Sequence, residues 1–568
     1  MDFDSVKPQF VSWPAELAKR YMEDGYWEGH TFAEEISRFC RRDPTAVALV
    51  DGDVVFSYAE LNDYSSVVGR RLLDMGLRPS DRILLQLPNS YELVLLILAC
   101  LRTGIVPVMA LPAHRYHEIS HVAKTAEVKA VAVVDVYRGF DHQGLAMKIA
   151  DELSSCRYVM VAGSELASGT INLHELLDFP VEAGDTVGAG SEDTIGAQPK
   201  DIAVFLLSGG TTGLPKLIPR THQDYIYNAA RCSEVAELSP ESVYLAVLPI
   251  SHNFPLACPG ILGTFHAGGK VVVLDSPEPM AAFRAIATHG VTHTAVVPAV
   301  AQRWMDAVSS SECPDISSLT VLQVGGARIA DELAKRVRPV LGCKLQQVFG
   351  MAEGLINMTR LDDPEDVICG TQGRPISPGD EILIVDEVGK EVANGESGLL
   401  LTRGPYTICG YYAAEEVNAR SFTSDGWYRS GDVVRMDPSG NLIVEGREKD
   451  IINRAGEKIS AEEVENFVYL HDAVALAAAV AVPDRSLGER ICLCVQVKEG
   501  YSLTLDDVAK LMEDQGLARF KWPEYLLVME ELPVTAVGKV DKKLIKDLAI
   551  KMLGLDYCCS IVPHFSVF

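Results

Sequence analysis

Seven short apolar runs, each closed by glycine, proline or a polar turn residue, constrain the fold of this chain more than any other feature. Helical patterns separate several of the runs, and strands that are apolar throughout are typical of parallel sheets buried on both faces. The sequence therefore predicts an α/β fold with largely parallel sheets. The runs are DRILLQLPNS (81–90), AVAVVDV (130–136), DIAVFLLSGG (201–210), KVVVLDS (270–276), HTAVVPA (293–299), TVLQVGGA (320–327) and KLQQVFG (344–350).

The chain has 568 residues, too many for a single core, so more than one domain is expected. From Asp380 the pattern changes to short alternating runs, which indicate a β-rich subdomain. After GREKD (446–450) a smaller α+β segment begins. We therefore expect a large N-terminal domain over residues 1–446, built of parallel-sheet α/β subdomains and the β-rich subdomain. A small α+β C-terminal domain would follow over 447–568.

Charge and composition exclude several classes of partner. The net charge of −27 argues against binding to nucleic acid or to an anionic membrane surface, because a phosphate backbone requires a basic footprint. The apolar run LVLLILACL (93–101) is too short to span a bilayer and predicts a buried helix. The acidic start MDFDSVKPQF does not resemble a signal peptide. The 13 cysteines form no CxxC pair, so free thiols in the cytoplasm are expected.

The stretch FLLSGGTTGLPKLIPRTH (205–222) carries the chemistry of an anion-binding loop. It is not a Walker A loop, because Pro215 precedes the lysine and Leu217 follows it. Glycines allow backbone N–H groups to converge on an anion, hydroxyls add donors and the lysine adds charge. Taken alone, the stretch is as compatible with a glycine-rich turn that holds no ligand. The candidate phosphate-binding residues are Ser208, Gly209, Gly210, Thr211, Thr212, Gly213 and Lys216.

Four further stretches follow this loop in fixed order and together form a specific set. Each is short, and any one of them is weak evidence by itself. The whole set resembles the ANL superfamily of adenylate-forming enzymes, which includes acyl-CoA synthetases, luciferases and adenylation domains of nonribosomal peptide synthetases. The resemblance runs from FSYAEL (56–61) to Leu548. The four stretches are FGMAEG (349–354), RSGDVV (429–434), GREKDIINRAGEKIS (446–460) and PVTAVGKVDKKLI (533–545).

The resemblance implies a nucleotide site for ATP and Mg²⁺. The loop would cover the triphosphate, Phe349 would stack on adenine, and Asp432 would bind the ribose hydroxyls with Arg447 beside it. Glu353 would coordinate Mg²⁺, which prefers hard oxygen ligands. Backbone and side-chain contacts to the nucleotide are further expected from Gly326, Val348 and Gly350.

The resemblance also assigns three catalytic residues, Lys539, Lys216 and His252, and a hinge. Lys539 would bridge the substrate carboxylate and the nucleotide, stabilising charge that grows as the carboxylate attacks the α-phosphate. Lys449 occupies the hinge position, about which the small mobile domain would rotate to admit the thiol acceptor. Lys542 and Lys543 are interpreted as solvated surface lysines.

The stretch LPISHNFPLACPG (248–260) bears on the acid that is activated. Amino-acid-activating members have Asp where this chain has Asn253, and an uncharged amide cannot form an ion pair with the substrate's ammonium group. Asn253 can exchange a hydrogen bond with an ortho hydroxyl on a ring, and His252 would lie near the reacting carboxylate. Taken alone, Asn253 is equally a turn residue before a proline, and His252 equally a core histidine. Several stretches, SHNFPL among them, resemble the stand-alone aryl-acid adenylases of siderophore pathways.

Two substitutions relative to the pattern of 2,3-dihydroxybenzoate-activating members favour salicylate. Cys258 replaces a serine that could pair with a ring 3-hydroxyl, and Ile356 is bulkier than the usual valine. Phe254 stands where tyrosine is frequent in these members, so one more hydroxyl is absent from the pocket. Neutral drift in a tolerant pocket is the alternative, so 2,3-dihydroxybenzoate, salicylate analogues and rings with another polar ortho group stay open. The remaining substrate-binding candidates are Gly325, Ala327 and Ala352.

The chain contains no carrier-domain or condensation motif, so the resemblance implies a separate phosphopantetheinylated aryl carrier protein as acceptor. An aryl-CoA ligase is the nearest alternative, because it shares the fold and the first half-reaction. A non-catalytic ligand-binding relative is the alternative from another class, and the intact Lys216, Glu353, Asp432 and Lys539 argue against it. The oligomeric state and the role of the apolar tail LGLDYCCSIVPHFSVF (553–568) stay open.

Overall fold

The computed structural model describes residues 10–178, 196–208, 214–309, 313–455, 457–484, 486–535 and 538–555. The predicted phosphate-binding residues Gly209, Gly210, Thr211, Thr212 and Gly213 lie outside this set. So do residues 182–195 of the polar segment before β10 and residues 556–568 of the apolar tail.

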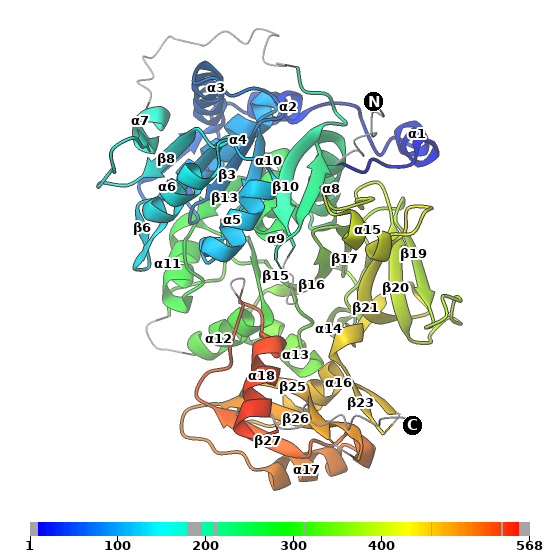
Figure 1. The fold of residues 1–568 in the computed structure, drawn as a ribbon. Helices are drawn as coiled ribbons and strands as arrows, with labels where there is room; N and C mark the ends of the chain where they lie inside the picture. The colour runs from blue at the N-terminus through cyan, green and yellow to red at the C-terminus, as the bar shows by residue number, and fades with distance from the viewer. Residues whose placement is uncertain are drawn as a thin grey trace, which may run out of the picture.

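Two large sheets form the N-terminal part of the described chain (Figure 1). Inner strands of both sheets run parallel, and antiparallel strands occur at the edges, as in β16–β17, β1–β2 and β10–β11. In spatial order, one sheet is β18(Arg374–Pro375), β17(Gly354–Met358), β16(Lys344–Met351), β15(Val321–Gly325), β14(His293–Val296), β12(Val243–Ala246), β13(Lys270–Val273), β1(Val47–Asp51) and β2(Val54–Ser57). The other is β11(Leu217–Thr221), β10(Ile202–Leu207), β4(Val106–Met109), β3(Arg82–Gln86), β5(Ala130–Val134), β8(Tyr158–Ala162) and β9(Ile171–Asn172).

The predicted α/β class is confirmed, and each of the seven apolar runs contains a strand: β3, β5, β10, β13, β14, β15 and β16. Strands β4, β8 and β12 are not among the predicted runs. Strand β4 is four residues long and includes Pro107, a residue that usually signals a turn in a sequence. In the structure Pro107 is tolerated inside a parallel pairing with β3.

The main core lies between the two sheets, around helices α3(Tyr58–Asp74) and α4(Tyr91–Thr103). Every residue of α4 from Leu93 to Thr103 is buried, which confirms the helix predicted from the run at 93–101. Ser90 caps the start of α4, and Gly104, in the left-handed conformation at φ 69°, ends it. None of the helices in the described ranges has the length and apolar character needed to cross a membrane.

The β-rich subdomain and the C-terminal segment each have their own sheet. The first is an antiparallel sheet of β19(Glu381–Val385), β20(Gly398–Arg403), β21(Tyr428–Met436) and β22(Leu442–Arg447). The second comprises β24(Glu457–Ser460), β23(Ile451–Arg454), β26(Gly488–Val497), β25(Val474–Asp484) and β27(Tyr525–Met529), and its helices are α16(Ala461–Val468), α17(Leu505–Asp514) and α18(Lys542–Met552). Figure 1 shows this second unit below the large sheets, joined to them after β22.

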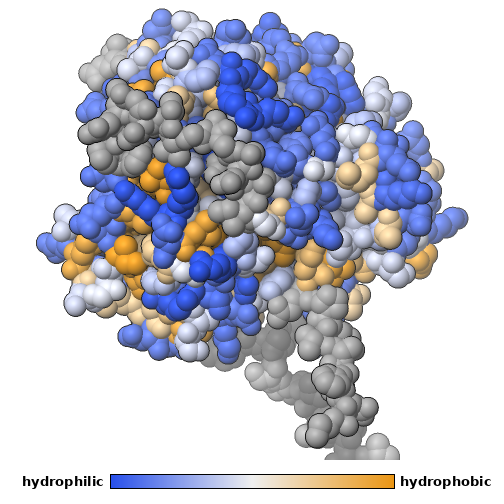
Figure 2. Space-filling model, turned by 90° about the horizontal axis from the view of Figure 1, so that it is seen from above, coloured by the Kyte–Doolittle hydropathy of each residue, from blue (hydrophilic) through white to orange (hydrophobic). Residues whose placement is uncertain are grey.

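The remaining elements connect and cover the sheets. These are α1(Ala15–Glu23), α2(Phe32–Arg42), α5(Tyr116–Thr125), β6(Val136–Tyr137), β7(Phe140–Asp141), α6(His142–Glu152), α7(Leu173–Leu177), α8(His222–Val235), α9(Asn253–Ala257), α10(Gly260–Ala267), α11(Pro279–His289), α12(Pro298–Ala307), α13(Asp331–Leu341), α14(Glu365–Gly370), α15(Glu415–Ser421), η1(Glu448–Asp450) and η2(Arg519–Lys521). Figure 2 shows the face farthest from the C-terminal unit, where hydrophilic side chains cover most of the coloured surface.

A backbone crossing at Gly373 provides a test of this packing. A Cβ atom added there would lie 2.1 Å from the Met358 carbonyl carbon, and the residue has φ +71°. Gly389 has φ +83° but open space around the same position. We expect Gly373→Ala to lower the free energy of unfolding by roughly 3 kcal/mol or more, because backbone atoms cannot move aside. Gly389→Ala should cost only about 1–2 kcal/mol. Urea unfolding of the two variants measures the difference, and equal losses would contradict this account of the crossing.

Candidate active site

The two ends of the predicted phosphate loop are held together at the end of β10. The Ser208 backbone N–H donates to the Lys216 carbonyl at 3.0 Å, and the Lys216 N–H donates to Ser208 Oγ at 3.0 Å. The Lys216 ammonium lies 5.2 Å from the centre of the Tyr411 ring, within the range of a cation–π contact. The two ends of the loop are therefore joined to each other, and its lysine is turned toward Tyr411.

A fully buried ion pair follows the loop. Arg220 Nε donates to Asp224 Oδ1 at 2.7 Å, and neither side chain is exposed. Asp224 also accepts from the backbone N–H and the hydroxyl of Thr221, which completes the N-terminal cap of α8. Arg220 Nη1 donates to the Ala352 carbonyl at 3.1 Å. One arginine thus connects β11, the start of α8 and the turn that precedes Glu353.

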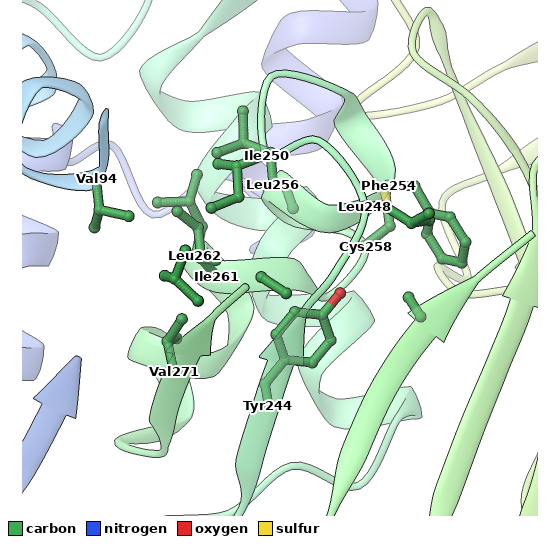
Figure 3. Packing of buried hydrophobic residues seen from close by; sticks show 14 of the residues in the cluster. Val94, Tyr244, Leu248, Ile250, Phe254, Leu256, Cys258, Ile261, Leu262 and Val271 are labelled. Carbon is green, nitrogen blue, oxygen red and sulfur yellow. The ribbon is translucent and has the colours of Figure 1, made fainter. Parts of the chain in front are cut away.

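The predicted substrate residues gather on the short helix α9. His252 precedes it and accepts from the Phe254 N–H through Nδ1 at 3.2 Å, which orients the ring as a helix cap. Asn253 is 5 % exposed and hydrogen-bonds Tyr225 and Cys258. Phe254 and Cys258 belong to the buried residues of the main core (Figure 3). The Cys258 sulfur has a polar partner as well as apolar neighbours, which the interpretation as a small hydrophobe did not foresee.

The end of β15 brings this helix against the C-terminal unit. A Cβ atom on Gly325 would lie 3.0 Å from two Phe254 ring carbons, and one on Gly326 would lie 2.9 Å from Lys539 Cε. Gly326 also has φ +82°, and Ala327 follows it. Both glycines are therefore sites of close approach, as their proposed contact with bound substrates requires.

Strands β16 and β17 carry the FGMAEG stretch. Val348 faces the main core, whereas Phe349 packs toward the β-rich subdomain. Gly350 pairs with Ile356, which is fully buried, and a Cβ on Gly350 would lie 3.1 Å from the isoleucine side chain. Beyond Ala352, Glu353 Oε1 accepts from the Tyr411 hydroxyl at 2.8 Å. Within the described residues no three His, Cys, Asp or Glu side chains form a metal-binding group.

Asp432 and Arg447 face each other across the β21–β22 pairing. Arg447 Nε lies 2.8 Å from Asp432 Oδ1, whereas Asp432 Oδ2 is buried and has no hydrogen-bond partner among the described residues. Burial raises the pKa of Asp432 above its ordinary value, against the opposing effect of Arg447. A buried carboxylate oxygen without a partner is costly, so this atom is available for a ligand hydroxyl.

Lys539 reaches into the same region from the C-terminal unit. Burial, together with the positive charge of Arg447, lowers the pKa of Lys539 to about 8, although Asp432 and Glu353 act in the opposite direction. Burial and the charge of Lys539 lower the pKa of His252 to about 3, so His252 is neutral near pH 7. The three predicted catalytic side chains thus come from the loop, from the residue before α9 and from the turn before α18.

The hinge candidate Lys449 lies in η1, next to this cluster of charges. Burial lowers its pKa, and the nearby positive charges of Arg447 and Lys216 act in the same direction. The interpretation of Lys542 as a solvated lysine was wrong, because its ammonium is 2.9 Å from Glu465 Oε1 in a largely buried ion pair at the start of α18. A sequence cannot reveal this pairing, since 77 positions separate the partners and an isolated lysine signals only solvent.

Sequence analysis missed Arg220, Asp224, Tyr225 and Tyr411 as residues that organise the site. The first three belong to PRTHQDY (219–225), directly after the predicted loop, and Tyr411 lies in GYY (410–412). A charged pair spaced i, i+4 at the start of a helix was the one local signal, and it is usually a surface feature.

Comparison with known proteins agrees with this geometry. Residues 36–412 match the family described as AMP-binding enzyme, and residues 463–539 match the AMP-binding enzyme C-terminal domain. The chain therefore belongs to the AMP-binding enzyme family and is an adenylating ligase that uses ATP. This confirms the resemblance to the ANL superfamily.

Relatives narrow the class to enzymes of aryl acids. The chain is 55 % identical over 540 residues to a salicylyl-CoA synthase / salicylate adenylyltransferase of Streptomyces sp, covering 95 % of this chain and 97 % of the relative. It is 44 % identical to a salicyl-AMP ligase / salicyl-S-ArCP synthetase of Mycobacterium tuberculosis, covering 96 % and 95 %. The apo structure of MbtA from Mycobacterium smegmatis superimposes with a TM-score of 0.71 at 45 % identity, covering 95 % and 98 %.

The lowered pKa of Lys539 predicts how adenylation depends on pH. As pH rises through about 8, Lys539 loses the proton that its proposed role requires, so kcat/KM should fall there. The fall reports the free enzyme, in which Arg447, Asp432 and Glu353 surround the ammonium. In Lys539→Arg the side chain keeps its charge, so whatever activity remains should stay flat from pH 8 to 10. ATP–pyrophosphate exchange measures both profiles. A fall near pH 8 that persists in the arginine variant would assign it to another group.

Proposed function

We propose that this enzyme activates an aryl carboxylic acid, with salicylate as the first choice, and transfers AMP from ATP to its carboxylate with release of pyrophosphate. The strongest support is a continuous series of contacts across the site. It begins at Asn253 and its neighbour Phe254, whose ring lies against Gly325. It ends at Gly326, against which Lys539 lies. A neutral, buried amide at one end suits an uncharged ortho substituent, and an ammonium at the other suits a carboxylate. The names of the salicylate-activating relatives support the same substrate.

In the proposed reaction a carboxylate oxygen attacks the α-phosphorus, and the bond from that phosphorus to the pyrophosphate oxygen breaks. Lys539 stabilises the charge that develops between the carboxylate and the α-phosphate. Lys216, with the Ser208 hydroxyl and the backbone of residues 209–213, would neutralise the departing phosphates. His252 is neutral and would act by packing and hydrogen bonding near the carboxylate.

The nucleotide would lie between the β15–β17 edge and β21. Asp432 Oδ2 is the proposed acceptor for the ribose hydroxyls, with Arg447 holding the other oxygen of the carboxylate. Phe349 is the proposed stacking partner of adenine.

Glu353 would hold Mg²⁺, which typically takes one or two carboxylates and completes its shell with phosphate oxygens and water. That ion would supply charge neutralisation for the phosphates. The backbone near Gly326, Val348 and Gly350, with Ala327 and Ala352, would line the rest of the pocket.

We further propose that residues 1–446 and 447–568 act as two domains and that Lys449 is the hinge between them. The end of β22 at Arg447 and the start of a separate sheet at Ile451 support this division. Rotation would withdraw Lys539 and admit the phosphopantetheine thiol of a separate aryl carrier protein. Coenzyme A is the competing acceptor, favoured by the name of the Streptomyces relative. Free thiols among the described cysteines support a reducing, cytoplasmic setting.

The choice of acid is tested by ATP–pyrophosphate exchange with benzoate, salicylate and 2,3-dihydroxybenzoate. Salicylate should be preferred, because a ring 3-hydroxyl would lack a strong partner at Cys258 and would meet the bulk of Ile356. A buried, unpaired hydroxyl costs about 1–3 kcal/mol, so kcat/KM should differ by roughly 10- to 100-fold. A Cys258→Ser change should reduce the difference in kcat/KM between salicylate and 2,3-dihydroxybenzoate, and adding Ile356→Val should reduce it further.

Equal use of salicylate and 2,3-dihydroxybenzoate by the unmodified enzyme would refute the specificity assignment. Activity with none of a wider panel of aryl acids would refute aryl-acid activation itself.

A further test of the proposed function separates the two half-reactions. Lys539→Ala should abolish adenylate formation, because the developing charge loses its stabilising ammonium. The same variant should still transfer the aroyl group from supplied aroyl-adenylate to the acceptor thiol with release of AMP, because that step would use another face of the small domain. Exchange and single-turnover thioester assays, run with a carrier protein and with coenzyme A, measure both steps and identify the acceptor. A variant equally impaired in both half-reactions would count against domain alternation.

A further inference from the structure

The side-chain amide of Asn253 is held at both ends by buried groups on the protein. Its carbonyl oxygen accepts from the Tyr225 hydroxyl at 2.8 Å, and its nitrogen lies 3.2 Å from Cys258 Sγ. These contacts point in different directions, because Tyr225 belongs to α8 and Cys258 follows α9. The nitrogen end is therefore the end that faces Cys258, where the proposed function puts the aromatic ring.

The donor strengths of the Tyr225 hydroxyl and the Cys258 thiol determine the orientation of the Asn253 amide. A phenol O–H is a far stronger donor than a thiol S–H, so the amide oxygen is better placed at Tyr225 and the amide N–H₂ at the sulfur. Tyr225 is itself immobilised, since its side chain is fully buried and the Arg220 guanidinium lies 4.6 Å from its ring centre. Arg220 is held in turn by Asp224. The orientation of Asn253 thus depends on a rigid chain of contacts beneath the pocket.

We propose that Tyr225 is a specificity-determining positioning residue, which occupies the Asn253 carbonyl oxygen so that an amide N–H meets the ortho substituent of the acid. This inference rests on the proposed aryl-acid activation. In salicylate the ortho hydroxyl donates to its own carboxylate, which leaves oxygen lone pairs that accept from the amide. In 2-aminobenzoate one amine hydrogen also turns to the carboxylate, but the second points outward and requires an acceptor. The site therefore selects an ortho hydroxyl over an ortho amine.

The test compares three acids that share a ring and a carboxylate: salicylate, 2-aminobenzoate and benzoate. The enzyme, Tyr225→Phe and the control Tyr227→Phe are assayed by ATP–pyrophosphate exchange. Tyr227 lies on the same helix, and its hydroxyl contacts Ser377 at 2.7 Å instead of the amide. Tyr225→Phe keeps the ring and removes only the hydroxyl, which frees the amide oxygen to turn toward the substrate.

We expect the unmodified enzyme to favour salicylate over 2-aminobenzoate by at least roughly 10-fold in kcat/KM. In Tyr225→Phe this ratio should fall at least about 5-fold, while kcat/KM for benzoate stays within about 2-fold. Tyr227→Phe should leave the ratio unchanged.

Three results would overturn the inference while leaving aryl-acid activation intact: an unchanged ratio in Tyr225→Phe, an equal loss with all three acids, or a preference of the unmodified enzyme for 2-aminobenzoate. If the unmodified enzyme activated no aryl acid at all, the proposed function and this inference would fall together.

Discussion

The buried ion pair between Arg220 and Asp224 is the interaction on which the rest of the site depends. Both side chains are fully inaccessible to solvent, and their charged atoms are 2.7 Å apart. Removing two charges from water is expensive, and losing one partner of such a pair typically costs about 3–5 kcal/mol. The desolvation cost is offset because both side chains also form hydrogen bonds to other groups. Asp224 caps α8, while Arg220 holds the Ala352 carbonyl on a different strand pair.

These contacts link the substrate end of the site to the nucleotide end. On one side Arg220 stacks on Tyr225, which reaches Asn253. On the other it fixes the turn before Glu353, whose carboxylate the Tyr411 hydroxyl orients at 2.8 Å. Tyr411 in turn lies under the Lys216 ammonium. The groups proposed to act on the carboxylate and the triphosphate are therefore positioned by a single connected set of buried polar residues.

Sequence patterns predicted the strands well and singled out the candidate site residues, because both depend on local spacing. The seven apolar runs contain strands, and Glu353, Asp432 and Lys539 come from short stretches with characteristic residues. Partners could not be predicted, because they are distant along the chain: 28 positions separate Tyr225 from Asn253, and 132 separate Arg220 from Ala352. The polar contact of Cys258 and the ion pair of Lys542 follow from tertiary packing, which overrides what an isolated cysteine or lysine indicates.

Electrostatics also explain why the closed arrangement, in which Lys539 of the C-terminal unit lies in the site, need not be permanent. In this structure Lys539 lies against Gly326, close to the positive charge of Arg447, and burial lowers its pKa to about 8. Even with the Asp432 and Glu353 carboxylates nearby, burial and the charge of Arg447 disfavour the ammonium form of Lys539 until further anions join it. In the proposed reaction the substrate carboxylate and the ATP phosphates supply those anions, so binding would favour the closed state by differential affinity. Once pyrophosphate leaves, most of the compensating charge is gone and the lysine again bears its desolvation cost. In the proposed cycle the chemical step would thus remove the reason for closure, and the small domain would be free to present another face to the acceptor thiol.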